Sequence, residues 1–221
     1  MSLRGLLFDF DGLVLDTETP ELLSWQEVWQ DHGHELPRER FESGLGMVGG
    51  FGAIAALEEL VGPVDREAIL DRQRKRKLSL LDGEELRAGV VDYLEQARRR
   101  GLATAIVSSS SRAWIDSNLV RLDSAGYFDV IVTGDHDRRR GKPSPTLYLE
   151  ALDQLGLTAD ESVAFEDTPV GVRAARTAEI FCVAVPNKVT GSLDFREANL
   201  VVHSLEDLPF ASLLDQFSQS T

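Results

Sequence analysis

Short apolar runs alternate with segments of helical periodicity over most of this chain. Each run has the length of a buried strand, and apolar residues in the segments between the runs recur every three to four positions. The expected strands cover Gly5–Phe10, Ala103–Ser108, Val130–Thr133, Val163–Glu166, Phe181–Val185 and Leu200–Val202. The expected helices between them cover Val90–Arg100, Arg112–Leu122, Pro145–Leu155 and Val170–Ala178. Such alternation predicts an α/β fold built on a doubly wound parallel sheet.

Residues 17–82 break this alternation, because they contain no convincing strand. Their periodicity instead predicts helices over Glu21–Asp31, Arg38–Ser43, Gly52–Leu60 and Arg66–Leu81. An all-helical insert directly after the first strand indicates a separate lid, since loops at that end of a sheet carry function. We therefore expect a catalytic core of residues 1–16 and 83–221, with hinges at Leu13–Asp16 and Gly83–Gly89.

Two aspartates follow the first expected strand. Asp9 and Asp11 are separated by one residue, so an extended chain points both side chains the same way. The carboxyl end of a parallel strand borders the crevice in which open α/β sheets bind ligands. Two carboxylates this close repel each other unless a cation or a shared proton relieves them. The pair indicates a metal site, an acid/base pair or a nucleophile beside an acid, although a polar turn would also fit.

Three later segments carry chemistry of the same kind. Ser108-Ser109-Ser110-Ser111 ends the second expected strand, Gly141-Lys142-Pro143 precedes a helix, and Glu166-Asp167 ends a further strand. Helix starts favour anions, because free backbone N–H groups and the helix dipole meet there. Hydroxyl groups, a lysine and two carboxylate pairs together suit a phosphate group and a divalent metal.

These motifs, in this order, resemble those of the haloacid dehalogenase superfamily. The resemblance rests on Asp9-x-Asp11, Ser108, Lys142 and Glu166-Asp167 and covers nearly the whole chain. The stretches Phe8-Asp9-Phe10-Asp11-Gly12, Asp16-Thr17-Glu18, Gly141-Lys142-Pro143 and Phe165-Glu166-Asp167-Thr168-Pro169-x-Gly171 are similar to the subgroup of β-phosphoglucomutase and small sugar-phosphate phosphatases. The resemblance implies a Rossmann-like core and a four-helix cap that closes over the site.

It also implies an order of chemical events. Asp9 would attack phosphorus to give an aspartyl-phosphate, and Asp11 would protonate the leaving alcohol and later deprotonate water. Mg²⁺ would bind to Asp9, Asp167, Glu166 and the backbone carbonyl of Asp11. A helix N-cap with acidic first-turn residues is the alternative interpretation of Glu166-Asp167.

The remaining site residues would hold the phosphoryl group. Ser108 would donate to one of its oxygens, and Lys142 would balance the charge of the equatorial oxygens. Gly12, Ser109 and Ser110 are further candidates for phosphate binding. At Gly12, the absence of a side chain lets the backbone pass close to the phosphate. Ser110 or Ser111 is also expected to cap the helix that begins near Arg112. An exposed turn lysine is the ordinary alternative for Lys142.

Composition narrows the class of protein. Hydrophobic residues make up 43% of the 221 residues, enough for a core, and the formal net charge is −14 because 37 acidic residues outnumber 23 basic ones. Such an acidic chain disfavours nucleic acid or an anionic membrane as a partner. The single cysteine, Cys182, excludes an internal disulfide and fits a reducing, cytoplasmic location. No signal peptide or membrane-spanning apolar run is visible, and a monomer is expected.

Four functions compete on these grounds. The leading hypothesis is a Mg²⁺-dependent phosphatase that acts on a small phosphorylated metabolite such as a sugar phosphate. A β-phosphoglucomutase-type mutase is the alternative, but Glu21 stands where that mutase has a histidine. A non-catalytic binding protein and a dehalogenase are weaker hypotheses. Two segments of the insert could read the substrate: the basic run 72–77, whose ordinary interpretation is a solvated helical face, and the glycine-rich loop 44–50.

Overall fold

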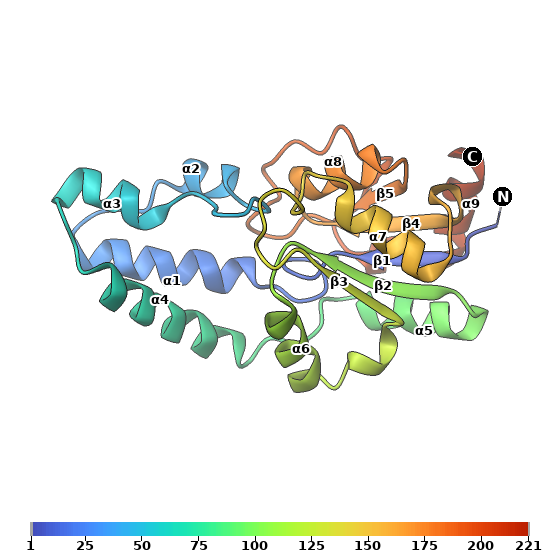
Figure 1. Ribbon diagram of the computed structural model, residues 1–221, viewed down its shortest axis with the longest axis horizontal. Helices are drawn as coiled ribbons and strands as arrows, with labels where there is room; N and C mark the ends of the chain where they lie inside the picture. Colours follow the sequence, from blue (N-terminus) through green and yellow to red (C-terminus); the bar gives the residue numbers. More distant parts are fainter. Residues whose placement is uncertain (1, 221) are drawn as a thin grey trace.

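A six-stranded parallel sheet forms the centre of the computed structural model, which describes residues 2–220 (Figure 1). The strand order is β3-β2-β1-β4-β5-β6. The strands are β1 (Gly5–Phe8), β2 (Ala103–Ser108), β3 (Val130–Thr133), β4 (Ser162–Glu166), β5 (Phe181–Ala184) and β6 (Leu200–Val201). Every ladder is parallel, and β1 lies between β2 and β4, where the strand order reverses. The predicted α/β class is confirmed, and the reversal is the point at which such sheets bind ligands.

Strand β1 is shorter than the sequence predicted. It ends at Phe8, whereas the apolar pattern extended it to Phe10. The backbone carbonyl of Phe10 accepts N–H groups from Leu13, Val14 and Leu15 at 3.3, 3.0 and 3.2 Å. These bonds close a tight turn that ends the strand, although the N–H of Asp9 still donates to the carbonyl of Phe165 at 3.0 Å and Phe10 remains buried.

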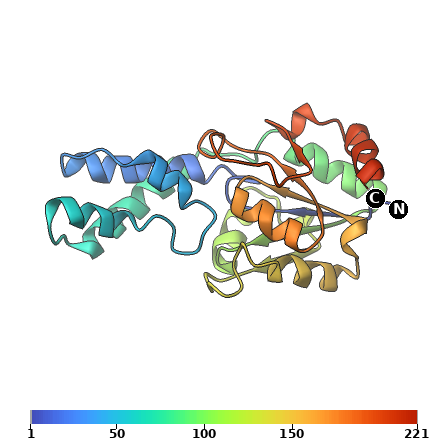
Figure 2. The same ribbon diagram turned by 90° about the horizontal axis from the view of Figure 1, so that it is seen from above.

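Helices cover both faces of the sheet (Figure 2). The core helices are α5 (Val90–Arg100), α6 (Arg112–Arg121), α7 (Thr146–Leu155), α8 (Pro169–Thr177) and α9 (Phe210–Ser220). Apolar residues of α5, α6 and α9 share one buried cluster with one face of the sheet, and those of α7 and α8 share a second cluster with the other face. Helix α9 was not predicted from the sequence, although Phe210, Leu213 and Phe217 form a buried stripe at helical spacing.

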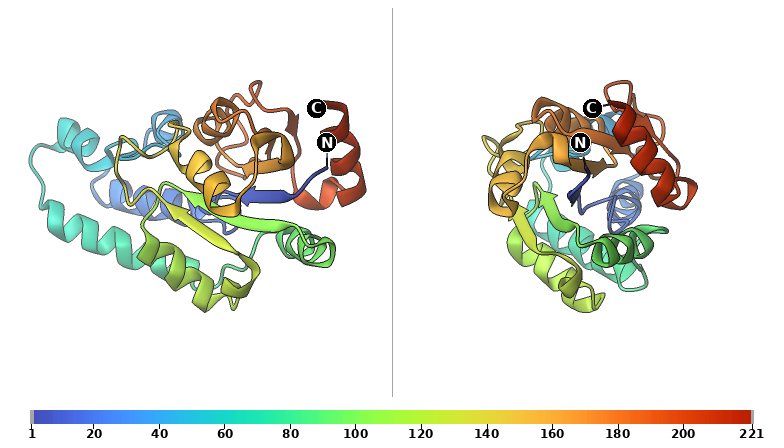
Figure 3. Two further views of the ribbon diagram at one scale, coloured as in Figure 1. Left: turned by 45° about the vertical axis from the view of Figure 1, so that its right-hand side comes forward. Right: turned by 90° about the vertical axis from the view of Figure 1, so that its right-hand side faces the viewer.

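Residues 17–82, here called the helical insert, project beyond the carboxyl ends of the strands (Figures 1 and 3). The insert contains α1 (Glu18–Asp31), α2 (Arg38–Ser43), α3 (Ala53–Val61) and α4 (Arg66–Leu81). Helix α1 begins three residues earlier than predicted, because Asp16 accepts the backbone N–H of Thr19 at 3.0 Å and caps the first turn. Most of a third apolar cluster, including Trp25, Trp29 and Leu57, lies in the insert, and Val189 of the core also belongs to it.

The two chain crossings between insert and core lie side by side. Leu15 on the outgoing segment forms an antiparallel bridge with Leu86 on the returning one, and the N–H of Arg87 donates to the carbonyl of Val14 at 2.9 Å. The Arg87 guanidinium also donates to the carbonyls of Gly12 and, at 3.1 Å, Pro186. Both crossings are therefore fixed beside the strand ends. Among residues 2–220, no helix has the length and apolar character needed to cross a membrane.

Candidate active site

Three carboxylates meet where the strand order reverses. Asp9 follows β1, while Glu166 and Asp167 end and follow β4; each offers one oxygen, and these oxygens lie within 4.8 Å of one another. Sheet register explains the meeting, because Phe8 pairs with Phe165 and the next residue on each strand is a carboxylate. All three side chains are buried. Among residues 2–220, Oε2 of Glu166 and Oδ1 of Asp167 find no hydrogen-bond partner, so the cluster offers free oxygen ligands to a hard cation.

Lys142 neutralises part of this charge. Its Nζ bonds Oδ1 of Asp9 and lies 2.6 Å from Oε1 of Glu166, and the Tyr148 hydroxyl donates to the same Glu166 oxygen at 2.6 Å. Lys142 is only 5% exposed, so it is not the solvated turn lysine of the alternative interpretation. Its backbone N–H donates to Oγ of Ser109 at 3.1 Å, which fixes the loop before α7.

The cluster carries more negative charge than Lys142 offsets. Burial raises the pKa of Asp9 to about 8; Lys142 lowers it, but Glu166 and Asp11 raise it further. Burial, and then Asp9, raise the pKa of the Asp167 carboxyl well above its usual range. Although burial lowers it, Asp9 and Glu166 hold the pKa of Lys142 above its ordinary value. A divalent cation among these oxygens would relieve the repulsion.

Two glycines leave room for the carboxylates. Gly12 has φ +80°, and a Cβ there would collide with Oδ2 of Asp167 and stand 2.8 Å from Nδ2 of Asn187. A Cβ at Gly171, in the first turn of α8, would collide with Oε2 of Glu166. The backbone of Gly12 therefore approaches the site, as expected, but the side chain that it approaches is Asp167. Gly171, to which no function had been assigned, leaves space for the Glu166 carboxylate.

Asn187 belongs to the site and was also missed. Its Nδ2 donates to Oδ2 of Asp167 at 2.8 Å and to the carbonyl of Gly12 at 3.2 Å. Its Oδ1 accepts the N–H groups of Val189 and Thr190, so the amide is held in a fixed orientation. The signal was a polar residue just after the buried run Phe181–Val185, at the same edge of the sheet as the other site residues.

Asp11 is not a member of the carboxylate cluster and has partners of its own. Its Oδ2 accepts from Oγ of Ser110 at 2.6 Å and, more weakly, from Oγ of Ser108 at 3.4 Å. Its Oδ1 accepts from Nε1 of Trp114 at 2.8 Å. Ser110 thus reaches Asp11, and Ser111 is the residue that caps α6 by accepting the N–H of Trp114 at 3.3 Å. Asp9 and Asp11 therefore occupy different surroundings.

The helical insert adds charged groups on the Asp11 side. Nζ of Lys77 lies 2.7 Å from Oε2 of Glu21 and 5.1 Å from the centre of the Trp114 ring. Burial, and then Asp11, raise the pKa of Glu18 to about 8, while Lys77 lowers it. Arg72 and Arg76, from the same basic run, instead pair with Asp31 and Glu27 on α1 and are largely exposed. Most of the run is a solvated face, and Lys77 alone of these three basic residues lies beside Asp11.

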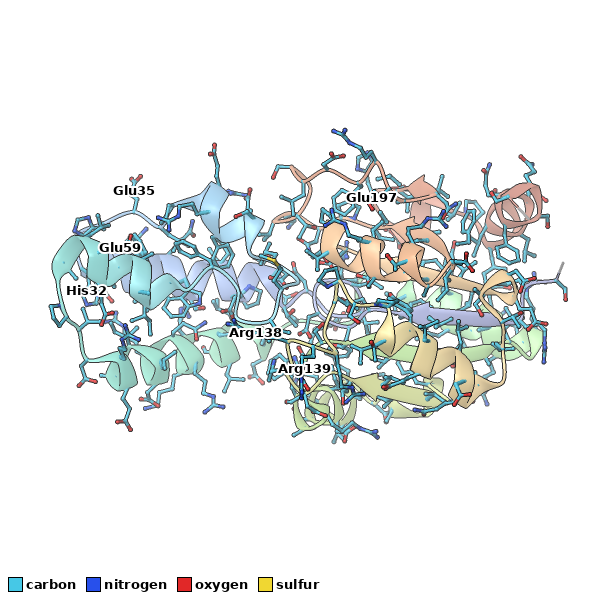
Figure 4. The ribbon with its side chains drawn as sticks, turned by 45° about the horizontal axis from the view of Figure 1, so that its top comes forward. His32, Glu35, Glu59, Arg138, Arg139 and Glu197 are labelled. Carbon is cyan, nitrogen blue, oxygen red and sulfur yellow. The ribbon has the colours of Figure 1, made fainter. Side chains whose placement is uncertain are left out.

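The glycine-rich loop of the insert lies against the core. A Cβ at Gly46 would stand 2.7 Å from Oγ1 of Thr168, and one at Gly49 would stand 2.6 Å from Nη2 of Arg138. Arg138 and Arg139 lie where the core loop 134–141 meets the insert, whereas His32, Glu35 and Glu59 lie at its far end (Figure 4). Among the described residues, no histidine joins the carboxylate cluster.

Comparison with known protein families gives a match over most of the chain. The model for the haloacid dehalogenase-like hydrolase family matches residues 6–185. The chain belongs to this family. The protein YhcW of Bacillus subtilis, which carries a provisional phosphatase name, is 38% identical over 98% of each chain. A phosphorylated-carbohydrate phosphatase of Thermotoga maritima is 30% identical over 93% of this chain and 88% of its own.

A solved structure extends the likeness to the whole fold. A variant of CbbY from Rhodobacter sphaeroides in complex with xylulose 1,5-bisphosphate is 27% identical and has a TM-score of 0.76, with 96% of this chain and 99% of that chain covered. The resemblance drawn from the motifs is confirmed. The chain is a hydrolase of this family, and the phosphatase names of its relatives support phosphoric monoester hydrolysis as its activity.

Proposed function

We propose that this enzyme is a Mg²⁺-dependent phosphatase that hydrolyses a small phosphorylated metabolite, such as a sugar phosphate, through an aspartyl-phosphate at Asp9. The main support is the buried cluster of Asp9, Glu166 and Asp167 beside Lys142, in which two carboxylate oxygens have no partner within the described part of the chain. The T. maritima relative is named for phosphorylated carbohydrates, and CbbY was crystallised with a sugar bisphosphate. These names favour a sugar phosphate over other monoesters.

The donor set fits Mg²⁺. Asp9, Glu166, Asp167 and the backbone carbonyl of Asp11 would hold the ion, and the free oxygens of Glu166 and Asp167 are ready ligands. When bound, the ion would neutralise charge on the phosphoryl oxygens and orient them. Lys142 would supply further positive charge on the same side, because its Nζ already lies between Asp9 and Glu166.

The residues of the chain would carry out two successive displacements. A carboxylate oxygen of Asp9 attacks phosphorus, the bond from phosphorus to the ester oxygen breaks, and Asp11 gives its proton to the departing alcohol. Asp11, now ionised, takes a proton from water as the water oxygen attacks phosphorus. The bond between Asp9 and phosphorus then breaks, and inorganic phosphate and both carboxyl groups are restored. Ser108 would donate a hydrogen bond to an oxygen of the transferring group.

Residues 17–82 would act as the cap. The glycine-rich loop lies against Thr168 and Arg138, and Lys77 lies beside Asp11, so the insert borders the site from the open side. A closed cap would exclude bulk water and hold the leaving group. Glu21, which replaces the mutase histidine, is bonded to Lys77 and accepts from Nε1 of Trp25 at 2.8 Å. It is not free for the histidine's role, and this favours hydrolysis over mutase chemistry.

The test is release of inorganic phosphate from a panel of sugar phosphates by purified enzyme, with EDTA and with added Mg²⁺. We expect turnover with Mg²⁺ and its loss in EDTA, reversed by excess Mg²⁺. Phosphate release that is unaffected by EDTA would contradict the metal requirement. Interconversion of hexose phosphates without phosphate release would instead identify a mutase.

A further inference from the structure

One indole ring links the two halves of the site. Trp114, in the first turn of α6, donates from Nε1 to Oδ1 of Asp11 at 2.8 Å. The face of the same ring lies 5.1 Å from Nζ of Lys77 on α4, within the range of a cation–π contact. The edge of the ring therefore meets the carboxyl group, and its face meets a cation of the insert. Nothing in the local sequence pattern had indicated a function for Trp114.

The two oxygens of Asp11 have partners of different kinds. The indole N–H is a donor only, so Oδ1 must be an acceptor whenever this bond is present. Oδ2 faces the hydroxyls of Ser110 and Ser108, which rotate and can donate or accept. A proton on Asp11 is thus compatible with Oδ2 and incompatible with Oδ1.

We propose that Trp114 is a positioning residue for proton transfer: it holds Oδ1 of Asp11, so that the carboxyl group gives and takes its proton through Oδ2. This inference rests on the proposed function, because it requires Asp11 to be the general acid and base. Lys77 supports the arrangement by packing on the ring face, which leaves the indole edge directed at Asp11.

The indole N–H is not what attaches α6 to the core. Ile115 and Leu119 form the buried face of α6, and Ser111 caps the first turn of this helix. Trp114→Phe removes the N–H donor and keeps an aromatic ring for Lys77 to contact, so it isolates the proposed function. Ser111→Ala is the matched control, because it weakens the same helical turn and leaves the indole in place.

The experiment compares kcat/KM for phenyl phosphate and p-nitrophenyl phosphate. The two esters are similar in size, but phenolate leaves poorly without a proton and nitrophenolate leaves well. We expect Trp114→Phe to lower kcat/KM by about tenfold or more for phenyl phosphate and by less than about threefold for p-nitrophenyl phosphate. Ser111→Ala should affect the two esters equally. In an Asp11→Asn background, Trp114→Phe should have no further selective effect.

The outcomes separate this inference from the proposed function. An equal loss on both esters, or an undiminished selective loss in the Asp11→Asn background, would overturn the positioning function of Trp114. If Asp11→Asn itself fails to discriminate between the esters, Asp11 is not the general acid, and the proposed mechanism fails first. Selective loss in Asp11→Asn with none in Trp114→Phe would refute only the function of the indole.

Discussion

The nucleophile side of the site and the proton-transfer side are built in different ways. Asp9, Glu166 and Asp167 come from neighbouring strand ends, are buried, and lie beside a buried lysine. Asp11 lies in the turn that follows β1 and is only partly buried. Its partners come from a serine loop and helix α6, and Lys77 of the insert lies over the Trp114 ring. Sheet register positions the first group, whereas side-chain contacts between distant segments position the second.

This difference predicts which changes the enzyme tolerates. A buried, charged cluster has little room to relax, so a small change should abolish activity or metal binding. The Asp11 side faces the insert and is partly solvated, so changes there should alter rates selectively and by smaller factors. The following predictions test that ranking.

The largest effect is expected at Asp9. Asp9→Asn keeps the shape of the side chain and removes the nucleophile, so kcat should fall by at least about a thousandfold, or about 4 kcal/mol. Steady-state kinetics and a thermal melt would show whether activity is lost without loss of folding. Asp123→Asn, in an exposed turn after α6, is the matched control and should retain normal turnover. If the kcat of Asp9→Asn stays within about tenfold of the parent value, Asp9 is not the nucleophile.

Gly171→Ala should rank next. Replacing a helical glycine by alanine commonly stabilises a protein by about 0.5–1 kcal/mol. Here the new Cβ would collide with Oε2 of Glu166, so we expect Mg²⁺ affinity to fall by about tenfold to a hundredfold. Isothermal titration with Mg²⁺ measures this directly. Gly126→Ala is the control, because nothing lies within 4 Å of a Cβ there; equal Mg²⁺ affinity in both variants would refute the expected displacement of Glu166.

The buried acids should make metal-free stability depend on pH. The pKa of Asp9 is about 8 in the folded protein and about 3.9 in the unfolded chain, so the folded state binds the proton more tightly. This contribution to stability is present below about pH 4 and is lost as the pH rises towards 8. In EDTA, the Tm of the parent relative to Asp9→Asn should therefore fall between pH 5 and pH 8. Mg²⁺ should raise the parent's Tm more at pH 8; a relative Tm that rises with pH would contradict the assignment.

The smallest effects are expected in the basic run of the insert. Lys77→Met removes the cation beside Asp11 and Glu21, so KM for sugar phosphates should rise by about threefold to tenfold. Arg72→Gln, which breaks only an exposed pair with Asp31, should change KM by less than about twofold. Added salt should weaken the difference if exposed attraction contributes. Equal effects of the two substitutions would show that the insert attracts substrate through its general charge.

The nucleophile side of the site was easier to predict from the sequence than the proton-transfer side. Strand ends have a local signature, an apolar run followed by a polar residue, and parallel register then brings Asp9, Glu166 and Asp167 together. The bond between Trp114 and Asp11 joins residues 103 positions apart and has no local signature. Asn187 likewise reaches Asp167 across 20 residues through a loop whose path the pattern does not determine.

The same contrast holds for the fold. The alternation of strands and helices predicted the parallel sheet, though not the order of its strands, and four helices were expected in the insert. What the pattern could not predict was which face of α4 meets the core. Lys77 lies over Trp114, whereas Arg72 and Arg76 point to α1, and packing of α4 on α1 decides this. The buried bond from Gln73 to Ser24, at 3.0 Å, fixes that packing.

The most direct test of the account is to trap the phosphorylated residue. In Asp11→Asn, p-nitrophenyl phosphate should still phosphorylate Asp9, since nitrophenolate needs no proton, while hydrolysis of the aspartyl-phosphate lacks its base. We predict a burst of nitrophenolate stoichiometric with enzyme, and conversion of Asp9 to homoserine after quenching and reduction with borohydride, located by peptide mass spectrometry. Nitrophenolate release far beyond the enzyme concentration, with Asp9 unmodified at every time point, would contradict covalent phosphoryl transfer to Asp9.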